Sequence, residues 1–360
     1  MAISSSHWMS ALPDQTPMKA VSTPGTHDAC CHDITGVAAQ LATSKWKPLF
    51  AAAAVVPAAG LLGLTAAEYV VRVLALTQTL NIRQQLDAGV RFFDLRPYFG
   101  DGQTLPIYHG IVRTTSTLPG VLREITNFLS QHRSEYVVLR LKAEGDSLSG
   151  SARRNLLQQC LTPFSNFVSP RISKDTWQVS DVRGKMVLLL DGIDSLPAPF
   201  HSESWSNASI QDEFEINANE NFISTVAEGA CNIVSTPVRS VLSFFGKKTN
   251  NWCDGVGKSV PKIFVPDKVF DSKRVAIKNH HLTSTSRRQL SRFSLNFISC
   301  IGSGSDILFL SPQVCSTKFN PGIKKLISDT ASKEKTGIVV MDFINEDLAK
   351  GIYLANPLIT

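Results

Sequence analysis

The chain has 360 residues, of which 43% are hydrophobic and 18% are charged, and its net charge is +6. This composition excludes a disordered chain and suffices for one large α/β domain or two ordinary ones. The seven cysteines include no CxxC pair, which argues against a disulfide framework and a zinc cluster. The first ten residues lack a basic and an apolar leader region. We therefore expect no Sec signal in this sequence, and a protein that is cytoplasmic, is exported by a signal-less route, or has lost its leader.

Short apolar runs that end in polar residues recur along the chain and predict β-strands. One helical pattern between them, residues 118–132, repeats its apolar positions every three or four residues. Strands that alternate with helices imply a parallel sheet. Polar residues that follow many of the strands imply a barrel with its site at the carboxyl ends of the strands. The predicted strands cover residues 20–23, 90–93, 105–108, 136–141, 186–190, 295–301 and 338–341.

An apolar insert, residues 45–76, interrupts this alternation. Its longest uncharged stretch, residues 48–67, reaches the length of about 20 residues that a membrane-spanning helix needs. Pro57, Gly60 and Gly63 interrupt the stretch. Three interpretations remain open: a helix pair packed against the barrel, an element that dips into a bilayer surface beside the site, and a spanning helix.

A basic insertion, residues 237–292, holds twelve Lys and Arg against three Asp, a balance of +9 that leaves −3 for the rest of the chain. It is either a solvated surface insertion or a contact for an anionic membrane surface. Aromatic residues are sparse within it, so we predict no nucleic-acid partner. The run Gly255–Ser259 resembles the end of a phosphate-binding loop. Trp252 replaces the required first glycine, so we predict no nucleotide partner either.

Two short runs carry the chemistry. Pro24–Asp28 reads PGTHD, and Phe93–Arg96 reads FDLR and precedes Tyr108–Gly110, which reads YHG. Each places His, Asp or Arg just after an apolar stretch. Two histidines, carboxylates and an arginine are the groups that phosphodiester cleavage needs, because one imidazole takes a proton, the other gives one, and the cation holds the phosphate.

Taken together, these motifs resemble the X domain of bacterial phosphatidylinositol-specific phospholipase C. The resemblance rests on the two runs above and on further segments in the same order from the start of the chain to its end. It implies one catalytic domain over residues 1–360, a distorted TIM-like (β/α) barrel with the apolar and basic inserts within it. The further segments are Trp8–Met9, Leu12–Pro13, Gln78–Leu80, Gln84–Arg96, Leu141–Glu144, Asp181–Lys185, Gln211–Phe214 and Val339–Phe343.

The resemblance also implies a division of labour in the cleavage of an inositol phospholipid into diacylglycerol and a cyclic inositol phosphate. His27 is expected as the general base, oriented by Asp342. His109 is expected as the general acid, with Asp28 as its carboxylate partner. Arg96 is expected to bind the phosphate. In addition, Asp94, which lies on the same strand face, is expected to hold Arg96.

For the head group, the resemblance implies five binding residues. Phe214 stands where the bacterial enzymes have a tyrosine that stacks on the sugar ring, so it keeps an aromatic face without the hydroxyl. The expected binding residues are Lys142, Glu144, Arg183, Asp212 and Phe214.

We expect neither a metal nor another cofactor. In the eukaryotic relatives, asparagine follows the catalytic histidine and carboxylates hold calcium. Here Asp28 follows His27, and Phe92 stands where a calcium-binding glutamate would be. Arg96 can then supply the positive charge. We further expect a monomer that associates peripherally with a membrane surface. The alternative is a non-catalytic or retargeted lipid-binding module on the same barrel, although every proton-transfer residue is present.

Overall fold

The computed structural model describes most of the barrel and its helices. The apolar insert at 45–76 lies outside the described residues except for 72, 75 and 76, and the basic insertion is described only at 267–284 and 292. The interpretations of both inserts therefore stay predictions. The described residues are 3–34, 72, 75–100, 104–110, 112–145, 148–170, 177–216, 267–284, 292–302, 310–329 and 337–356.

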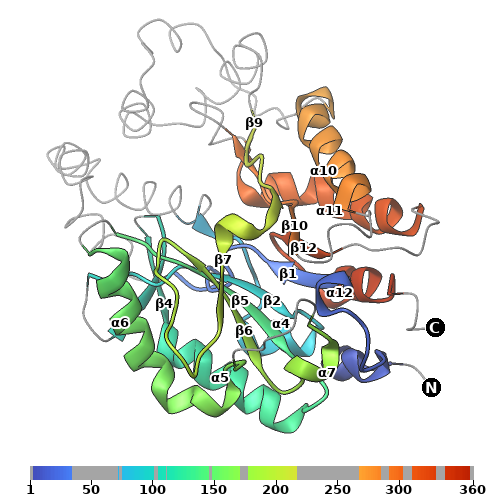
Figure 1. Cartoon of the computed structure of the whole chain (residues 1–360). Coiled ribbons are helices and arrows are strands. Elements are labelled where there is room, and N and C mark those ends of the chain that lie inside the picture. Colours follow the sequence, from blue (N-terminus) through green and yellow to red (C-terminus); the bar gives the residue numbers. More distant parts are fainter. Residues whose placement is uncertain are drawn as a thin grey trace, which may run out of the picture.

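An eight-stranded, all-parallel sheet forms the centre of the molecule, in the order β7-β6-β5-β2-β1-β12-β10-β8. Figure 1 shows the sheet curled, with helices outside it. The predicted α/β class and distorted barrel are confirmed. The strands are β1 (Thr23–Thr26), β2 (Phe92–Leu95), β5 (Val137–Lys142), β6 (Met186–Asp191), β7 (Ser202–Ser204), β8 (Ser209–Gln211), β10 (Ser294–Phe297) and β12 (Ile338–Met341).

Helices cover the outer face of the sheet. The helix predicted at 118–132 is α5 (Leu118–Gln131), which begins where the Thr117 side chain accepts a hydrogen bond from the Gly120 backbone N–H. Its apolar side is buried against the strands. The others are α4 (Ile82–Asp87), α6 (Gly150–Leu161), α7 (Val179–Val182), α10 (Asp271–Ser284), α11 (Pro312–Asp329) and α12 (Glu346–Tyr353), with 3₁₀ turns η1 (Ser5–Ala11), η2 (Met18–Ala20), η4 (Thr162–Phe167), η5 (Trp205–Asn207) and η6 (Asp267–Phe270).

One predicted strand differs from expectation. Residues 105–108 do not join the parallel sheet. Instead β3 (Pro106–His109) pairs antiparallel with β4 (Val112–Thr117) in a separate hairpin. The turn between them is too short for the crossover that parallel strands need. A further small pair, β9 (Glu215–Ile216) with β11 (Ile301–Gly302), lies apart from the barrel sheet.

Side chains alternate between the two faces of each strand, so the strands contribute to two separate apolar cores. On β2, Phe93 and Leu95 pack outward against the helices, whereas Phe92 packs into the barrel interior. The interior core continues to the N-terminal segment, where Trp8 is fully buried, stacks on Tyr353 at 5.1 Å between ring centroids, and donates to the Gly89 carbonyl. This aromatic packing fills the end of the barrel at which the strands begin.

A buried ion pair lies at the same end of the barrel, where the strands begin. The Arg91 guanidinium contacts the Glu135 carboxylate at 2.8 Å, and both side chains are fully buried. Arg91 also donates to the Ser5 and Ser6 carbonyls of the N-terminal segment. Because the pair lies before β2 and β5 begin, it closes the bottom of the barrel and leaves the carboxyl ends of the strands free for a site.

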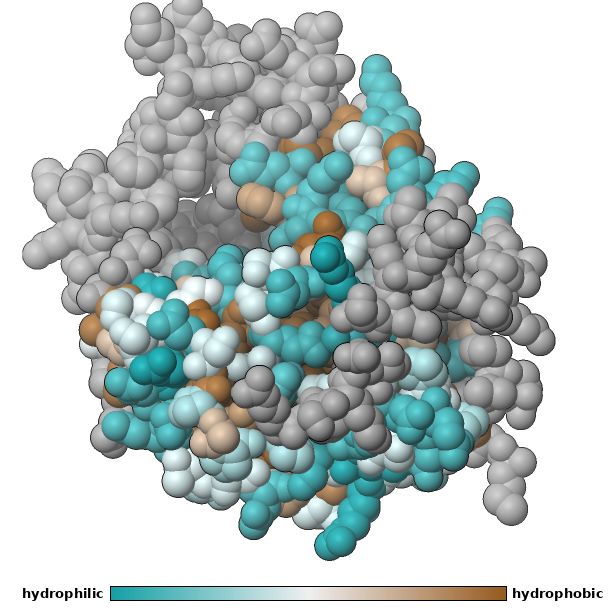
Figure 2. All heavy atoms as spheres, in the orientation of Figure 1, coloured by the Kyte–Doolittle hydropathy of each residue, from teal (hydrophilic) through white to brown (hydrophobic). Residues whose placement is uncertain are grey.

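No helix among the described residues is long and apolar enough to cross a membrane. On the face drawn in Figure 2, the described surface is mostly hydrophilic, and its hydrophobic residues form small, separate patches.

Candidate active site

Polar side chains gather where the parallel strands end. Side chains alternate between the two faces of a strand, so residues two apart point the same way. The last inward-facing residues of a strand therefore lie just above the apolar interior, and several of them here are charged. The carboxyl edge of a barrel is where loops can build a site. The clustered residues are His27 and Asp28 after β1, Asp94 and Arg96 on and after β2, Asp191 at the end of β6, Asp342 after β12, and His109 at the end of β3.

His27 is held from both sides. Its Nδ1 lies 2.9 Å from Oδ1 of Asp342, which leaves Nε2 facing the site. The side-chain amide of Gln78 donates to the carbonyls of His27 and Met341, and so ties the end of β1 to the end of β12. This arrangement fixes which imidazole nitrogen is available as a base.

Asp28 occupies the centre of the cluster. One carboxylate oxygen, Oδ2, lies 3.2 Å from Nε2 of His27 and also 3.2 Å from Nε2 of His109. The other, Oδ1, lies 2.6 Å from Nε of Arg96. The backbone of Asp28 has φ 40°, a left-handed conformation that aspartate tolerates better than most residues. The prediction paired Asp28 with His109 alone, whereas the structure also places it against His27 and Arg96.

Arg96 contacts both carboxylates and His27. Its Nη2 lies 3.1 Å from Oδ2 of Asp94 and donates to Nε2 of His27 at 2.9 Å. Burial would raise the pKa of Asp94, but Arg140 and then Arg96 outweigh it and hold that pKa well below its usual range. Burial opposes the charge of Arg96, yet Asp28 and Asp94 keep its pKa above the ordinary value. Both groups therefore stay charged.

His109 reaches the cluster from the hairpin. Its Nδ1 lies 3.0 Å from the Ala75 carbonyl, and its Nε2 faces Asp28. Both nitrogens of His109 thus face oxygen atoms. The rings of His27 and His109 are nearly perpendicular, with centroids 6.1 Å apart. The site therefore presents two imidazoles on either side of one carboxylate, and Nε2 of each faces that carboxylate.

The charge of His27 depends on its carboxylate neighbours. Burial lowers its pKa, but Asp28 and Asp342 outweigh burial and raise the pKa above the ordinary 6.5. We expect Asp342→Asn to lower this pKa, since the negative charge disappears while burial remains. A base works unprotonated, so the acid limb of the kcat/KM profile should move to lower pH. The limiting rate should fall by about 10–100-fold, less than loss of a general base itself. A pH–rate profile of the variant checks this, and an acid limb that stays in place or rises contradicts it.

The structure places four of the five predicted head-group residues at the same edge. Lys142 ends β5 on its inward face, opposite Asp191 in the sheet register. Glu144 lies 4.0 Å from Arg96, and its pKa is raised by burial despite that cation. Asp212 and Phe214 follow β8, where the Phe214 side chain is 52% exposed. Their roles in binding stay predictions.

Arg183 is the exception, and its prediction as a head-group residue is wrong. It precedes β6 and therefore lies at the amino ends of the strands, opposite the polar cluster. Its guanidinium contacts Asp14 at 2.8 Å and donates to the Met9, Leu12 and Ser134 carbonyls. Arg183 ties the N-terminal segment to the bottom of the barrel.

The residues at or near the cluster that were not predicted as site residues include Gln78, Arg140, Asp191 and Trp205. Gln78 joins two strand ends, and Arg140 lies inside the barrel between Asp94 and Asp191. Trp205 stacks over Arg140 from the turn between β7 and β8. The sequence offered a signal for Arg140, which is an arginine inside the apolar run 136–141, and Gln78 lies in one of the segments that carry the resemblance. Nothing in the sequence pointed to Trp205.

His27, Asp28 and Asp94 offer ligand atoms within 4.8 Å of one another, the spacing of a candidate metal site. Arg96, however, already contacts both carboxylates. A metal ion there would have to displace the guanidinium or share its ligands, so the arrangement favours Arg96 as the positive charge of the site.

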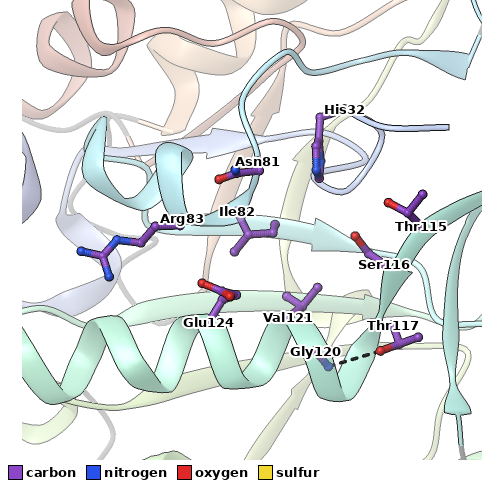
Figure 3. Close-up of a pocket in the computed structure, with 10 residues that line it drawn as sticks. All are labelled: His32, Asn81, Ile82, Arg83, Thr115, Ser116, Thr117, Gly120, Val121 and Glu124. Atoms are coloured by element: carbon purple, nitrogen blue, oxygen red, sulfur yellow. Dashed lines mark hydrogen bonds between the residues drawn. The ribbon is translucent and has the colours of Figure 1, made fainter.

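A pocket of about 450 Å³ lies elsewhere, beside α4 and the first turn of α5 (Figure 3). Its lining includes Arg83 and Glu124, which carry opposite charges, together with His32 and Thr117. None of its lining residues belongs to the polar cluster. We therefore place the candidate active site at the carboxyl edge of the barrel and not in this pocket.

The fold and the cluster define an α/β-barrel protein with two histidines, several carboxylates and an arginine gathered at the carboxyl edge of its sheet. Residues 65–190 match the family model described as phosphatidylinositol-specific phospholipase C, X domain. The family model thus matches about a third of the chain. The chain is 30% identical over 223 residues to a 1-phosphatidylinositol phosphodiesterase of Listeria monocytogenes, a match that covers 59% of each protein. It is 34% identical over 137 residues to the mouse PI-PLC X domain-containing protein 1, covering 37% of each.

Solved structures extend the likeness to the whole barrel. Phosphatidylinositol-specific phospholipase C from Listeria monocytogenes matches with a TM-score of 0.65 and 22% identity, covering 98% of this chain and 99% of the other. The Staphylococcus aureus enzyme matches with a TM-score of 0.63 and 18% identity, covering 98% of each chain. The chain therefore has the fold of these bacterial proteins.

Proposed function

We propose that this protein is a phosphatidylinositol-specific phospholipase C, a phosphodiester lyase that acts on an inositol phospholipid in a membrane surface. The observation that carries the proposal is the position of Asp28, which contacts both imidazoles and Arg96 at once. The matches to 1-phosphatidylinositol phosphodiesterases support the same reaction class.

In the first step, the 2-hydroxyl of inositol attacks phosphorus and loses its proton to Nε2 of His27. Asp342 holds the opposite nitrogen of His27 and stabilises the positive charge that the ring gains. Arg96 binds the phosphate oxygens as negative charge builds on them. Its contacts with Asp28 and Asp94 keep the guanidinium in place before substrate arrives.

In the same displacement, the bond between phosphorus and the diacylglycerol oxygen breaks. His109 gives its Nε2 proton to that oxygen, so diacylglycerol leaves as a neutral alcohol. The phosphate remains joined to inositol as a five-membered cyclic ester. Lys142, Glu144, Asp212 and Phe214 line the edge where the inositol ring would lie, and we assign head-group binding to them.

We expect turnover without a metal ion, because Arg96 already occupies the carboxylates that would hold one. The test is hydrolysis of a phospholipid panel in vesicles with EDTA present, scored for water-soluble head-group products. Cyclic inositol phosphate should appear from phosphatidylinositol and no product from phosphatidylcholine. The rate with EDTA should stay within about twofold of the rate with added calcium. Loss of activity in EDTA that calcium restores would refute metal independence.

The panel also tests the alternative of a lipid-binding module. Such a module would bind phosphatidylinositol vesicles and release no head-group product under any condition. That result would refute the proposed reaction and leave the lipid partner standing. Peripheral association with the membrane, which we also propose, predicts that the protein sediments with these vesicles whether or not it turns over.

A further inference from the structure

Arg140 is a buried cation inside the barrel to which the proposed reaction assigns no role. It lies on β5, directly opposite Asp94 in the register of β2 and β5. Only 4% of its surface is exposed. Neighbouring β5 side chains such as Leu139 and Leu141 pack outward in the apolar shell, so Arg140 points inward. A buried arginine is costly unless its charge is paired.

Three groups hold the guanidinium. Nη1 lies 3.3 Å from Oδ1 of Asp94, and Nη2 lies 2.7 Å from Oδ2 of Asp191 at the end of β6. The Trp205 ring covers the guanidinium at 3.8 Å from its centroid, the geometry of a cation–π contact. Nε has no hydrogen-bond partner, so the two carboxylates and the ring together fix the side chain.

Asp94 is consequently held at both of its oxygens. Oδ1 contacts Arg140, while Oδ2 contacts Nη2 of Arg96 and accepts from the backbone N–H of Asp28 at 3.4 Å. A carboxylate that is anchored through one oxygen alone can still rotate about its Cβ–Cγ bond. Anchoring of both oxygens removes that freedom and aims Oδ2 at Arg96.

We propose that Arg140 is a positioning residue that orients the phosphate-binding Arg96 through Asp94. The chain of contacts runs from Trp205 and Asp191 to Arg140, then to Asp94, Arg96 and Nε2 of His27. Arg140 touches no reacting atom in this scheme. The inference rests on the proposed function, because Arg96 matters to rate only if a phosphodiester reacts beside it.

A positioning role predicts a loss in kcat more than in KM, since the effect arises when charge develops on the phosphate. Arg140→Met should lower kcat about 10–100-fold on short-chain phosphatidylinositol and change KM by less than about threefold. Arg140→Lys keeps the charge and loses the flat fork that spans two carboxylates. It should recover part of the loss.

A double-mutant cycle separates positioning from general damage. In an Asp94→Asn background, Arg140→Met should cost less than about threefold in kcat, because the group through which it acts is already altered. A matched control is Arg91→Lys, which perturbs another buried arginine, at the bottom of the barrel. It should lower the denaturation midpoint and leave kcat unchanged.

Wild-type kcat in Arg140→Met overturns the inference, as does a loss of equal size in the Asp94→Asn background. If the wild-type protein cleaves no inositol lipid, the proposed reaction fails instead. A crystal structure of Arg140→Met then decides the positioning. The inference requires the Asp94–Arg96 contact of 3.1 Å to lengthen or become disordered. An unchanged contact refutes it.

Discussion

Replacing either His27 or His109 with alanine is expected to lower the rate of phosphatidylinositol cleavage by about 10²–10⁴-fold, the usual contribution of a general acid or base. Both side chains contact Asp28 and retain some solvent exposure, 17% for His27 and 22% for His109. They lie at strand ends and outside the apolar cores. The variants should therefore fold, and circular dichroism and the denaturation midpoint check this.

The choice of leaving group distinguishes the two roles. An inositol phosphodiester with a nitrophenol leaving group needs no proton on departure, so it should rescue His109→Ala far more than His27→Ala. Equal rescue of both variants would contradict the assignment of acid and base. His132→Ala is the matched control, because His132 directly follows α5 and stacks on Phe128 away from the cluster. It should keep wild-type turnover on both substrates.

Replacing Arg96 with lysine is expected to cause the second large loss of kcat. The guanidinium contacts Asp28 at 2.6 Å and Asp94 at 3.1 Å, and donates to His27 at 2.9 Å. A lysine ammonium keeps the charge and loses the planar fork that makes these contacts together. We expect kcat to fall about 10²–10³-fold, as when one donor is removed from a developing oxyanion. Steady-state kinetics on short-chain phosphatidylinositol measures it.

The surface pair of Arg83 and Asp87 supplies the control for this change. Arg83→Lys alters an exposed ion pair on α4, whose contribution to stability is small. It should leave kcat and KM unchanged. Near-native kcat in Arg96→Lys would mean that the phosphate is bound elsewhere, and Lys142 would then be the cation to test.

Much of the site could be predicted because strand direction decides which end of a strand carries chemistry. His27, Arg96 and Asp342 each follow a barrel strand, Asp94 lies one residue before the end of β2, and parallel strands bring such residues to one edge. His109 was also predicted, although its strand proved to be part of an antiparallel hairpin that brings it to Asp28. The motif determined its place in the site, whereas the inferred sheet position was wrong.

Arg183 shows where a motif alone misleads. Its segment was assigned to the head group by resemblance, although Arg183 precedes β6 and does not follow it. The sequence already shows that Arg183 comes before the predicted strand at 186–190. That order places Arg183 at the amino end of the barrel. Its hydrogen bonds to the Met9 and Leu12 carbonyls hold the N-terminal segment against the barrel.

By itself, the sequence determined the alternation of strands and helices, the parallel barrel and the residue types gathered at its carboxyl edge. These depend on local periodicity and chain direction, which short segments already contain. Only the tertiary structure decided that Asp28 contacts both histidines and that Arg140 braces Asp94 under Trp205. Those contacts depend on sheet register and on side-chain direction across distant strands, which no single segment specifies.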